Sequence, residues 1–224
     1  MKKNNKEQLF FKYRSLKGEN FEHFIDIVLN SRLYGASYKD LNDPMEGRYN
    51  KKGLETEDFK IINGSLKRSF ICSFSKKQED HKYPDNYLMW SHYADGHRGC
   101  CIEFTLKDNK NYWKVDEIKY NNEMPKFSKQ DIENSIDNFL YNKTELWKNE
   151  QEWRAVKHYK KAKNSKNQQK PSPYYYIKIK SVYIGLKNTK KQVKQYEKLI
   201  KAIDKDIIVH KMEPKNFQTI SGIC

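Results

Sequence analysis

The sequence predicts an α+β fold, and three observations point to that class. Short segments rich in Ile, Val, Tyr and Phe have the composition of strands, and other segments repeat apolar residues at helical spacing. The two kinds of segment are mixed without the strict alternation of βαβ folds. The 224 residues contain no internal repeat and no clear linker, so we expect a single domain over residues 1–224.

The first half of the chain is predicted to form short elements separated by polar turns. The apolar residues of 8–13 indicate a strand that leads into Arg14, and the spacing from Phe21 to Leu29 indicates a helix with Asn20 as its N-cap. Further extended pieces are expected at residues 33–37, 69–75, 100–106 and, more weakly, 114–120, with turns or loops at 41–44 and 76–85 and a short helix at 86–94.

The second half is predicted to begin with a longer helix that starts at Ser128. Its apolar face would consist of Ile132, Ile136, Phe139, Leu140 and Trp147. A strand at 152–159 is followed by a low-complexity basic segment near 160–173, which we expect to be a flexible loop. The remaining expected elements are a long strand or bent pair at 174–185, a helix with Val193, Tyr196, Ile200 and Ile203 on one face, and a last strand at 207–210.

Positive charge is concentrated near the C-terminus. The formal net charge is +15, and residues 157–215 hold seventeen lysines, four acidic residues and no arginine. Such a region attracts polyanions such as nucleic acid. Lysine suits loose attraction to a phosphate backbone better than the bidentate reading of bases, for which arginine is used. The alternative is that lysine serves here only as a solubilising residue.

The cellular setting follows from what the sequence contains. A signal peptide would have an apolar run after its basic start, and none follows the basic N-terminus here. No segment approaches the roughly 20 apolar residues that span a bilayer. The four cysteines, Cys72, Cys100, Cys101 and Cys224, show no disulfide framework. We therefore expect a cytoplasmic, soluble protein with reduced cysteines and no membrane contact. The oligomeric state is left open.

The densest functional pattern is Trp-Lys-Asn-Glu-Gln-Glu-Trp-Arg at residues 147–154. If this stretch is extended, Glu150 and Glu152 share one face, because side chains alternate along a strand. Two carboxylates so close resist joint ionisation unless a cation or hydrogen-bond donors hold them. Glu150 and Glu152 are therefore candidate catalytic residues. The alternative is an exposed acidic turn with Arg154 as a surface partner.

Zinc-ligand residue types are close together at His92, His97, Cys100 and Cys101. Zinc sites usually separate paired cysteines by two to four residues, and adjacent cysteines at the start of a strand point to opposite faces. We therefore expect no metal site and two small buried residues, and the role of the two histidines is left open. The sequence also has no P-loop, no Gly-x-Gly-x-x-Gly, no Gly-x-Ser-x-Gly and no His-Glu-x-x-His.

Three further features could line a binding pocket. Trp90 and Tyr93 offer aromatic faces beside Gly96 and Gly99, although both could simply pack a short helix. Arg14, directly after a strand, could bind a phosphate or carboxylate, or lie on the surface. Ser73 and Ser75 place two hydroxyls on one face of a strand, which could equally be a half-exposed strand.

Together these motifs resemble the bacterial domain-of-unknown-function family two-nine-seven-one over almost the whole chain. That family's name implies no activity. The motifs that carry the resemblance are Tyr13-Arg14, Leu-Asn-Asp-Pro-Met-Glu at 41–46, Cys-Ser-Phe-Ser at 72–75, Met-Trp-Ser-His-Tyr-Ala at 89–94, Gly99, the 147–154 stretch, and Tyr-Ile-Gly at 183–185.

The order of strand-Arg, Ser-x-Ser strand and Glu-x-Glu is also similar, more remotely, to the ADP-ribosyltransferase superfamily. That resemblance implies a split mixed β-sheet flanked by helices, with NAD as substrate and no metal. It also implies roles for individual residues. Arg14, Ser73 and Ser75 would bind NAD, Glu152 would be catalytic with Glu150 on the acceptor side, and Tyr93 or Trp90 would stack on nicotinamide. Ser-Phe-Ser departs from the common Ser-Thr-Ser, and Arg154 follows the glutamate unusually closely.

The expected function is therefore an ADP-ribosyltransferase-like or NAD-hydrolysing enzyme that acts on a protein or nucleic-acid acceptor. By analogy, such a protein would suit a toxin or phage-defence effector. One rival is a non-enzymatic nucleic-acid-binding protein that uses the lysine-rich C-terminal quarter. Another is a hydrolase or nuclease in which Glu150 and Glu152 hold a divalent ion.

Overall fold

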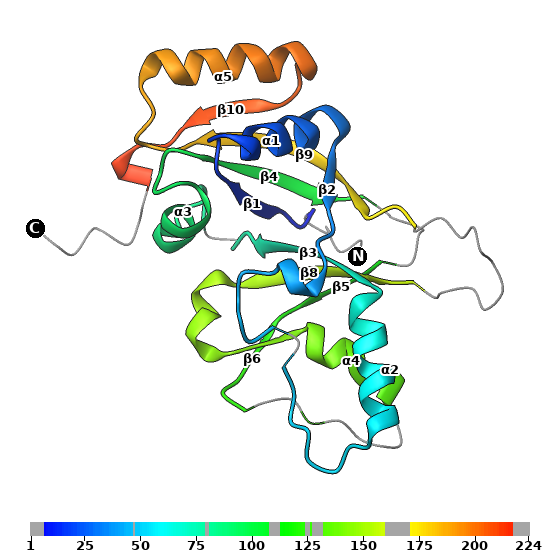
Figure 1. Cartoon of the computed structure of the whole chain (residues 1–224). Coiled ribbons are helices and arrows are strands. Elements are labelled where there is room, and N and C mark those ends of the chain that lie inside the picture. Colours follow the sequence, from blue (N-terminus) through cyan, green and yellow to red (C-terminus); the bar gives the residue numbers. More distant parts are fainter. Residues whose placement is uncertain are drawn as a thin grey trace, which may run out of the picture. The chain divides into compact units, whose positions relative to one another are not determined.

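The structure is a computed structural model that describes residues 7–46, 48–78, 81–107, 113–123, 126, 132–159 and 171–216. It has the predicted mixed α+β architecture, with helices and a mostly antiparallel multistranded sheet (Figure 1). The contacts within the chain divide it into two compact units. Unit 1 comprises Met1–Leu33, Phe74–Asp108 and Tyr176–Cys224, and unit 2 comprises Tyr34–Ser73 and Asn109–Tyr175. The ADP-ribosyltransferase type of split sheet stays a prediction, as does the single domain.

Unit 1 is built on four strands and the end of a fifth. Their order is β10 (Ile208–Lys211), β9 (Tyr174–Ile184), β4 (Cys100–Leu106), β1 (Phe10–Arg14) and the last residues of β3 (Ser69–Lys76). Neighbouring strands are antiparallel except β9 and β10, which are parallel. The register places Tyr13 opposite Cys101 and Arg14 opposite Cys100. The two adjacent cysteines therefore occupy opposite faces, as predicted.

Helices cover both faces of the sheet in unit 1. On one face, α1 (Glu19–Asn30) and α5 (Lys190–Ile203) lie side by side (Figure 1), with the rings of Phe21 and Tyr196 6.3 Å apart. On the other face, α3 (Tyr87–Tyr93) packs Trp90 edge-on against Tyr13 at 5.5 Å. Burial of these apolar surfaces is the main stabilising contribution. The buried cluster on the α3 side consists of Phe11, Tyr13, Trp90, Ala94, Cys101, Tyr183 and Met212.

Unit 2 has its own strands and core. β8 (Glu152–His158) lies between the first part of β3 and β5 (Lys114–Glu117), with which it is antiparallel. β6 (Lys119–Tyr120) and β7 (Asn142–Lys143) form a short parallel pair. α2 (Thr56–Lys67) and α4 (Ile132–Leu140) lie side by side (Figure 1) and pack Ile62, Leu66, Ile136 and Leu140 into one apolar cluster with Val156 of β8.

The remaining elements are short. They are β2 (Arg32–Tyr34), which pairs with β9, and the 3₁₀ helices η1 (Tyr38–Asp40), η2 (Glu145–Glu150) and η3 (Pro214–Asn216).

Two local predictions were wrong, and one helix was missed. The first helix begins at Glu19 after Gly18, so Asn20 is not its N-cap, and α2 was not predicted at all. The second-half helix ends at Leu140, and Trp147 belongs to the separate η2. α2 was missed because Asn63 and Gly64 in its middle are poor helix formers, and burial of Ile62 and Leu66 outweighs that preference. Ser128 and residues 160–170 of the expected loop lie outside the described residues.

Candidate functional site

Unit 2 contains a buried cluster of charged side chains that includes both candidate glutamates. We call it the ionic cluster; its members are Glu46, Lys143, Glu150, Glu152 and Arg154. The Lys143 ammonium donates to Glu150 Oε2 at 2.6 Å and to Glu152 Oε2 at 3.0 Å. Arg154 Nε donates to Glu152 Oε1 at 2.7 Å, and its guanidinium also binds both oxygens of Glu46, with Nη1 3.0 Å from Oε2. The site is therefore one connected network.

A sharp turn of the backbone positions the two glutamates. Glu150 ends η2, Gln151 adopts a left-handed conformation with φ of 47°, and Glu152 begins β8. Residues 150–152 are therefore not continuously extended, which was the condition under which the two glutamates would share one face of a strand. The two carboxylates converge because both accept hydrogen bonds from Lys143 at the end of β7. Trp147 also contacts this lysine, whose ammonium lies 4.7 Å from the indole ring.

Burial and charge act in opposite directions on the ionisation of these groups. Burial alone would raise the pKa of Glu152, but the charges of Arg154 and Lys143 outweigh it and lower that pKa to about 2. The pKa of Glu46 is raised, because burial there outweighs the attraction of Arg154. Burial opposes the charge of Lys143 as well, yet Glu152 and Glu150 raise its pKa above the ordinary value. Glu152 is thus a buried, permanently ionised carboxylate at neutral pH.

Two hydroxyl side chains complete the surroundings of Glu152. The Ser73 side chain hydrogen-bonds the carboxylate and contributes to its lowered pKa. The Tyr120 oxygen accepts a hydrogen bond from the backbone N–H of Glu152 at 2.8 Å. Burial raises the pKa of Tyr120, so this phenol stays protonated at neutral pH. The Ser73 and Glu152 side chains that the sequence singled out separately are therefore in direct contact.

The place between the two glutamates is occupied by a protein cation. Lys143 reaches both carboxylates at hydrogen-bond distance, where a divalent ion would have to bind in the hydrolase alternative. Within the described part of the chain, no group of three or more His, Cys, Asp or Glu residues is arranged to hold a metal ion.

The remaining candidate residues lie in unit 1. Arg14 shares its face of the sheet with Cys100, whereas Trp90 packs on Tyr13 at the opposite face. Trp90 is fully buried, and its Nε1 donates to the Pro84 carbonyl at 2.5 Å. The position of Trp90 is therefore that of a core residue.

The other two candidates in unit 1 differ in accessibility. Ser75 lies opposite Phe11 and is 6% exposed, and its hydroxyl has no hydrogen-bond partner among the described residues. Tyr93 is half-buried at the end of α3, so its ring is the more accessible of the two candidate nicotinamide-stacking aromatics.

His97 is buried within the aromatic surroundings of α3. Its ring is stacked on Trp90 with centroids 6.1 Å apart and lies 4.3 Å from that of Tyr87. Burial, with a contribution from Lys187, lowers the pKa of His97, so the imidazole is neutral at neutral pH. Cys100 and Cys101 are fully buried with free thiols. This arrangement accounts for His97 as a packing residue.

Three members of the ionic cluster were not predicted as site residues, and Arg154 was considered only as a surface partner of the glutamates. Nothing around Lys143 distinguishes it in the sequence from the many other lysines. Glu46 belongs to the Asn-Asp-Pro-Met-Glu motif, which carried the family resemblance but gave no sign that its carboxylate would meet Arg154, 108 residues away. Only the packing of distant segments brings Lys143 and Glu46 to the glutamates and Arg154.

A serine, a histidine and an aspartate also form a chain of contacts in unit 2. Ser69 Oγ lies 2.8 Å from His158 Nδ1, and His158 Nε2 lies 2.7 Å from Asp137 Oδ1. Ser69 Oγ also donates to the Ser65 carbonyl at 2.8 Å, and Ser69 is 2% exposed. A nucleophilic serine must donate its proton to the base, whereas this hydroxyl donates its proton to a backbone carbonyl. This trio therefore links β3, α4 and β8, and is not a hydrolase site.

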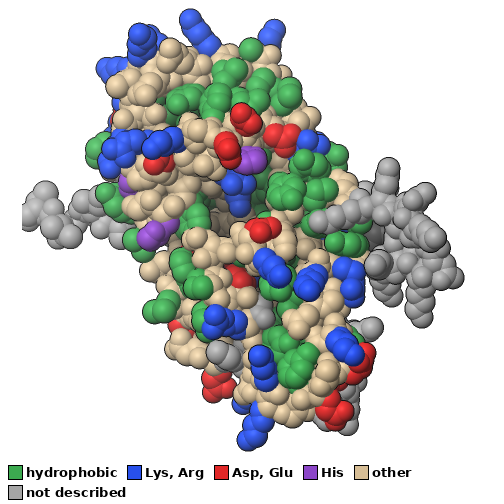
Figure 2. Space-filling model, viewed as in Figure 1, with side chains coloured by type: hydrophobic (Ala, Val, Ile, Leu, Met, Phe, Trp, Pro, Cys, Tyr) green, Lys and Arg blue, Asp and Glu red, His purple; other side chains and the backbone are tan. Residues whose placement is uncertain are grey.

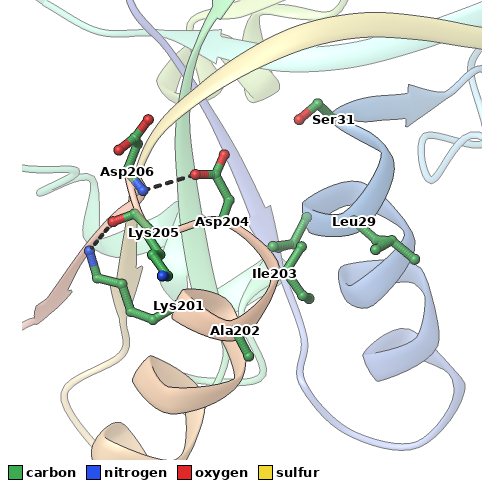
Figure 3. Close-up of a pocket in the computed structure, with 9 residues that line it drawn as sticks. Leu29, Ser31, Lys201, Ala202, Ile203, Asp204, Lys205 and Asp206 are labelled. Atoms are coloured by element: carbon green, nitrogen blue, oxygen red, sulfur yellow. Dashed lines mark hydrogen bonds between the residues drawn. The ribbon is translucent and has the colours of Figure 1, made fainter.

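A surface hollow of about 420 Å³ lies in unit 1, between the C-terminal ends of α1 and α5 (Figure 3). None of the predicted site residues lines it. Leu29, Ala202 and Ile203 give it an apolar wall, and Ser31, Asp204 and Asp206 give it a polar rim.

Comparison with known proteins gives one match. Residues 89–155 match the model of a family described as protein of unknown function (DUF2971). The family resemblance predicted from the sequence is thereby confirmed over α3, β4 and the segment that ends in the Glu-x-Glu-Trp-Arg motif. No curated protein and no solved structure matches the chain.

Proposed function

We propose that this protein with a DUF2971 match cleaves NAD and transfers its ADP-ribose unit to a protein or nucleic-acid acceptor, or to water. In this reaction the bond between the ribose C1 and the nicotinamide nitrogen breaks, and nicotinamide leaves with the electron pair. An acceptor oxygen or nitrogen then bonds to C1 and loses its proton to solvent. Glu152 is the carboxylate that faces the ribose, and Glu150 is on the acceptor side.

The observation that carries the proposal is the buried carboxylate of Glu152, which Arg154 and Lys143 hold at hydrogen-bond distance. Loss of nicotinamide builds positive charge on the ribose, as in the oxocarbenium-like state of glycoside cleavage. A preorganised carboxylate in a dry site stabilises such charge far better than it would in water. The ionic cluster has three carboxylates and two cations, so its formal charge leaves one negative charge in excess.

The contact between Ser73 and Glu152 also supports the proposal. In the superfamily resemblance, the Ser-x-Ser strand supports the catalytic glutamate, and Ser73 hydrogen-bonds that carboxylate here. Arg14 for the diphosphate, Ser75 for the nicotinamide half and Tyr93 or Trp90 for ring stacking remain assignments by resemblance. By analogy, such an enzyme would act in the cytoplasm as a toxin or a phage-defence effector.

The test is nicotinamide release from NAD by the purified full-length chain, with and without protein extract or nucleic acid. Glu152→Gln should abolish release, because the amide cannot stabilise a positive ribose. Glu46→Gln is the matched control, since it also removes a carboxylate from Arg154 but not one assigned to the reaction. Circular dichroism shows whether both variants fold. Equal nicotinamide release by a folded Glu152→Gln variant and the wild type would rule the proposal out.

The second candidate is nucleic-acid binding without catalysis. It is favoured by the exposed lysines of α5, which form no salt bridge with any carboxylate in the described part of the chain. The two candidates differ in their response to NAD. A rise in melting temperature with NAD but not with magnesium supports the enzyme, whereas a response to oligonucleotide alone supports the binding protein.

A further inference from the structure

One side of α5 carries a continuous row of lysines, which we call the lysine ridge. At 100° per residue, all five side chains of the helix fall within an arc of about 100°. They recur every three or four residues over most of the helix, so neighbouring ammonium groups are on the order of 5 Å apart along its axis. The members are Lys190, Lys191, Lys194, Lys198 and Lys201.

The charges of the ridge are offset only in part within the protein, because Glu197 lies beside the ridge on α5 and Glu213 attracts Lys190. The first four lysines are exposed, and none of the five forms a salt bridge with a described carboxylate. Lys201 donates to the backbone carbonyl of Lys205 at 2.7 Å, which leaves its charge in place. Figure 2 shows blue side chains projecting over this part of the surface. The row of five lysines keeps an excess of positive charge, which attracts a polyanion and releases its counterions on binding.

The opposite side of α5 excludes insertion into a membrane. Ile200 is fully buried, and Tyr196 contacts Phe21 of α1. Helices that bind at a membrane surface bury an apolar face among the lipid chains. Here the apolar face is already used for packing within unit 1, so only the charged side is available. The ridge therefore favours a nucleic-acid backbone over a lipid surface.

The hollow at the C-terminal end of α5 extends this surface. Lys201 belongs to both, because it also lines the hollow (Figure 3). The apolar wall of Leu29 and Ile203 suits the flat face of a nucleobase. Asp204 and Asp206 repel phosphate, but their carboxylates can accept hydrogen bonds from the amino groups of a base. In a duplex those base edges are paired, so an unpaired base fits better.

We infer that α5 binds single-stranded nucleic acid, with the phosphate backbone along the lysine ridge and one unpaired base in the hollow. This inference is independent of NAD cleavage, because it concerns α5 and the end of α1 and is tested without NAD. For the proposed enzyme, it identifies single-stranded nucleic acid as the class of acceptor and α5 as the surface that binds it.

The test is fluorescence anisotropy of a labelled single-stranded oligonucleotide titrated with the full chain at several salt concentrations. Wild-type affinity should fall with salt with a log–log slope of about −3, since roughly four phosphates are neutralised. Replacing Lys191, Lys194, Lys198 and Lys201 together by Gln should weaken binding on the order of a hundredfold at ~0.1 M salt and flatten the slope.

The matched control replaces four exposed lysines of unit 2, namely Lys51, Lys52, Lys67 and Lys119, by Gln. Both quadruple variants have the same net charge, so only the position of the charges differs. The control should bind within about threefold of the wild type, because only the ridge is taken to contact phosphate. Equal losses in the two variants would show attraction by net charge alone and would overturn the inference.

Two further arms test the kind of partner. Single strands should bind more tightly than the duplex of the same sequence. Binding of the protein to vesicles should not increase with their content of anionic lipid. Tighter binding to duplex or to vesicles would contradict the inference. Asp206→Asn should reduce any preference for bases with amino groups over thymine, while the salt slope remains unchanged. A base preference that does not respond to this change would exclude the hollow as the base site.

Discussion

The ionic cluster of unit 2 and the lysine ridge of unit 1 treat charge in opposite ways. In unit 2, Glu152 and Arg154 are 5% and 1% exposed, and each is held by several charged partners. On α5 of unit 1, most lysines of the ridge are exposed to solvent, and none forms a salt bridge with a described carboxylate. A buried charge must be paired, because the loss of hydration is otherwise too costly, whereas an exposed charge needs no partner. Substitutions should therefore cost stability in the ionic cluster and binding in the ridge.

The largest effect on stability is expected from Arg154→Met. The guanidinium binds Glu46, Glu152 and the Leu140 carbonyl, so its removal leaves two buried carboxylates short of a partner. We expect a loss of about 3–5 kcal/mol in the free energy of unfolding, measured by urea denaturation. Arg154→Lys should recover only part of it, because an ammonium cannot replace the fork of the guanidinium. A loss below about 1 kcal/mol would mean that the contacts of Arg154 within the ionic cluster contribute little to stability.

The second effect concerns acid stability. The pKa of Glu152 is about 2 in the folded protein, below its ordinary value of 4.5. A lowered folded-state pKa contributes stability above the unfolded pKa, and this contribution disappears as pH falls toward the folded value. Glu152→Gln should therefore remove on the order of 3 kcal/mol of pH-dependent stability between about pH 5 and pH 2. The free energy of unfolding measured across this range provides the check.

Glu46→Gln should change the pH profile in the opposite sense. The folded-state pKa of Glu46 is raised, so its ionisation costs stability as pH rises through that pKa. The variant removes this cost, and its stability relative to the wild type should improve from acid to neutral pH. Similar pH profiles for Glu46→Gln and Glu152→Gln would show that the two carboxylates are not in different electrostatic environments.

The smallest effect on stability is expected from the ridge. Replacing Lys191, Lys194 and Lys198 by Gln, one at a time, should change the free energy of unfolding by no more than about 0.5 kcal/mol, because the side chains are exposed and form no salt bridge with a described carboxylate. Urea denaturation of each variant gives this value. A loss above about 1 kcal/mol would indicate that these lysines have a structural role.

The sequence alone determined much of the local structure. The segments predicted as strands at 100–106 and 152–159 form β4 and β8, because period and β-propensity are local properties. The opposite faces of Cys100 and Cys101 followed from the alternation of side chains along a strand. The spacing of the lysines in residues 190–201 is likewise visible in the sequence, and the helical period alone places them on one side.

Tertiary structure decided what the charged residues do. No local rule brings Glu46 to Arg154 or places Lys143 between Glu150 and Glu152, because those contacts depend on how distant segments pack. The turn at Gln151 was also not visible in its neighbours. Burial then sets the consequence of each contact, since the same ion pair contributes little in water and a great deal in a dry interior. The Glu-x-Glu motif was visible in the sequence, whereas the lowered pKa of Glu152 and the pairing of both carboxylates with Lys143 depend on the fold.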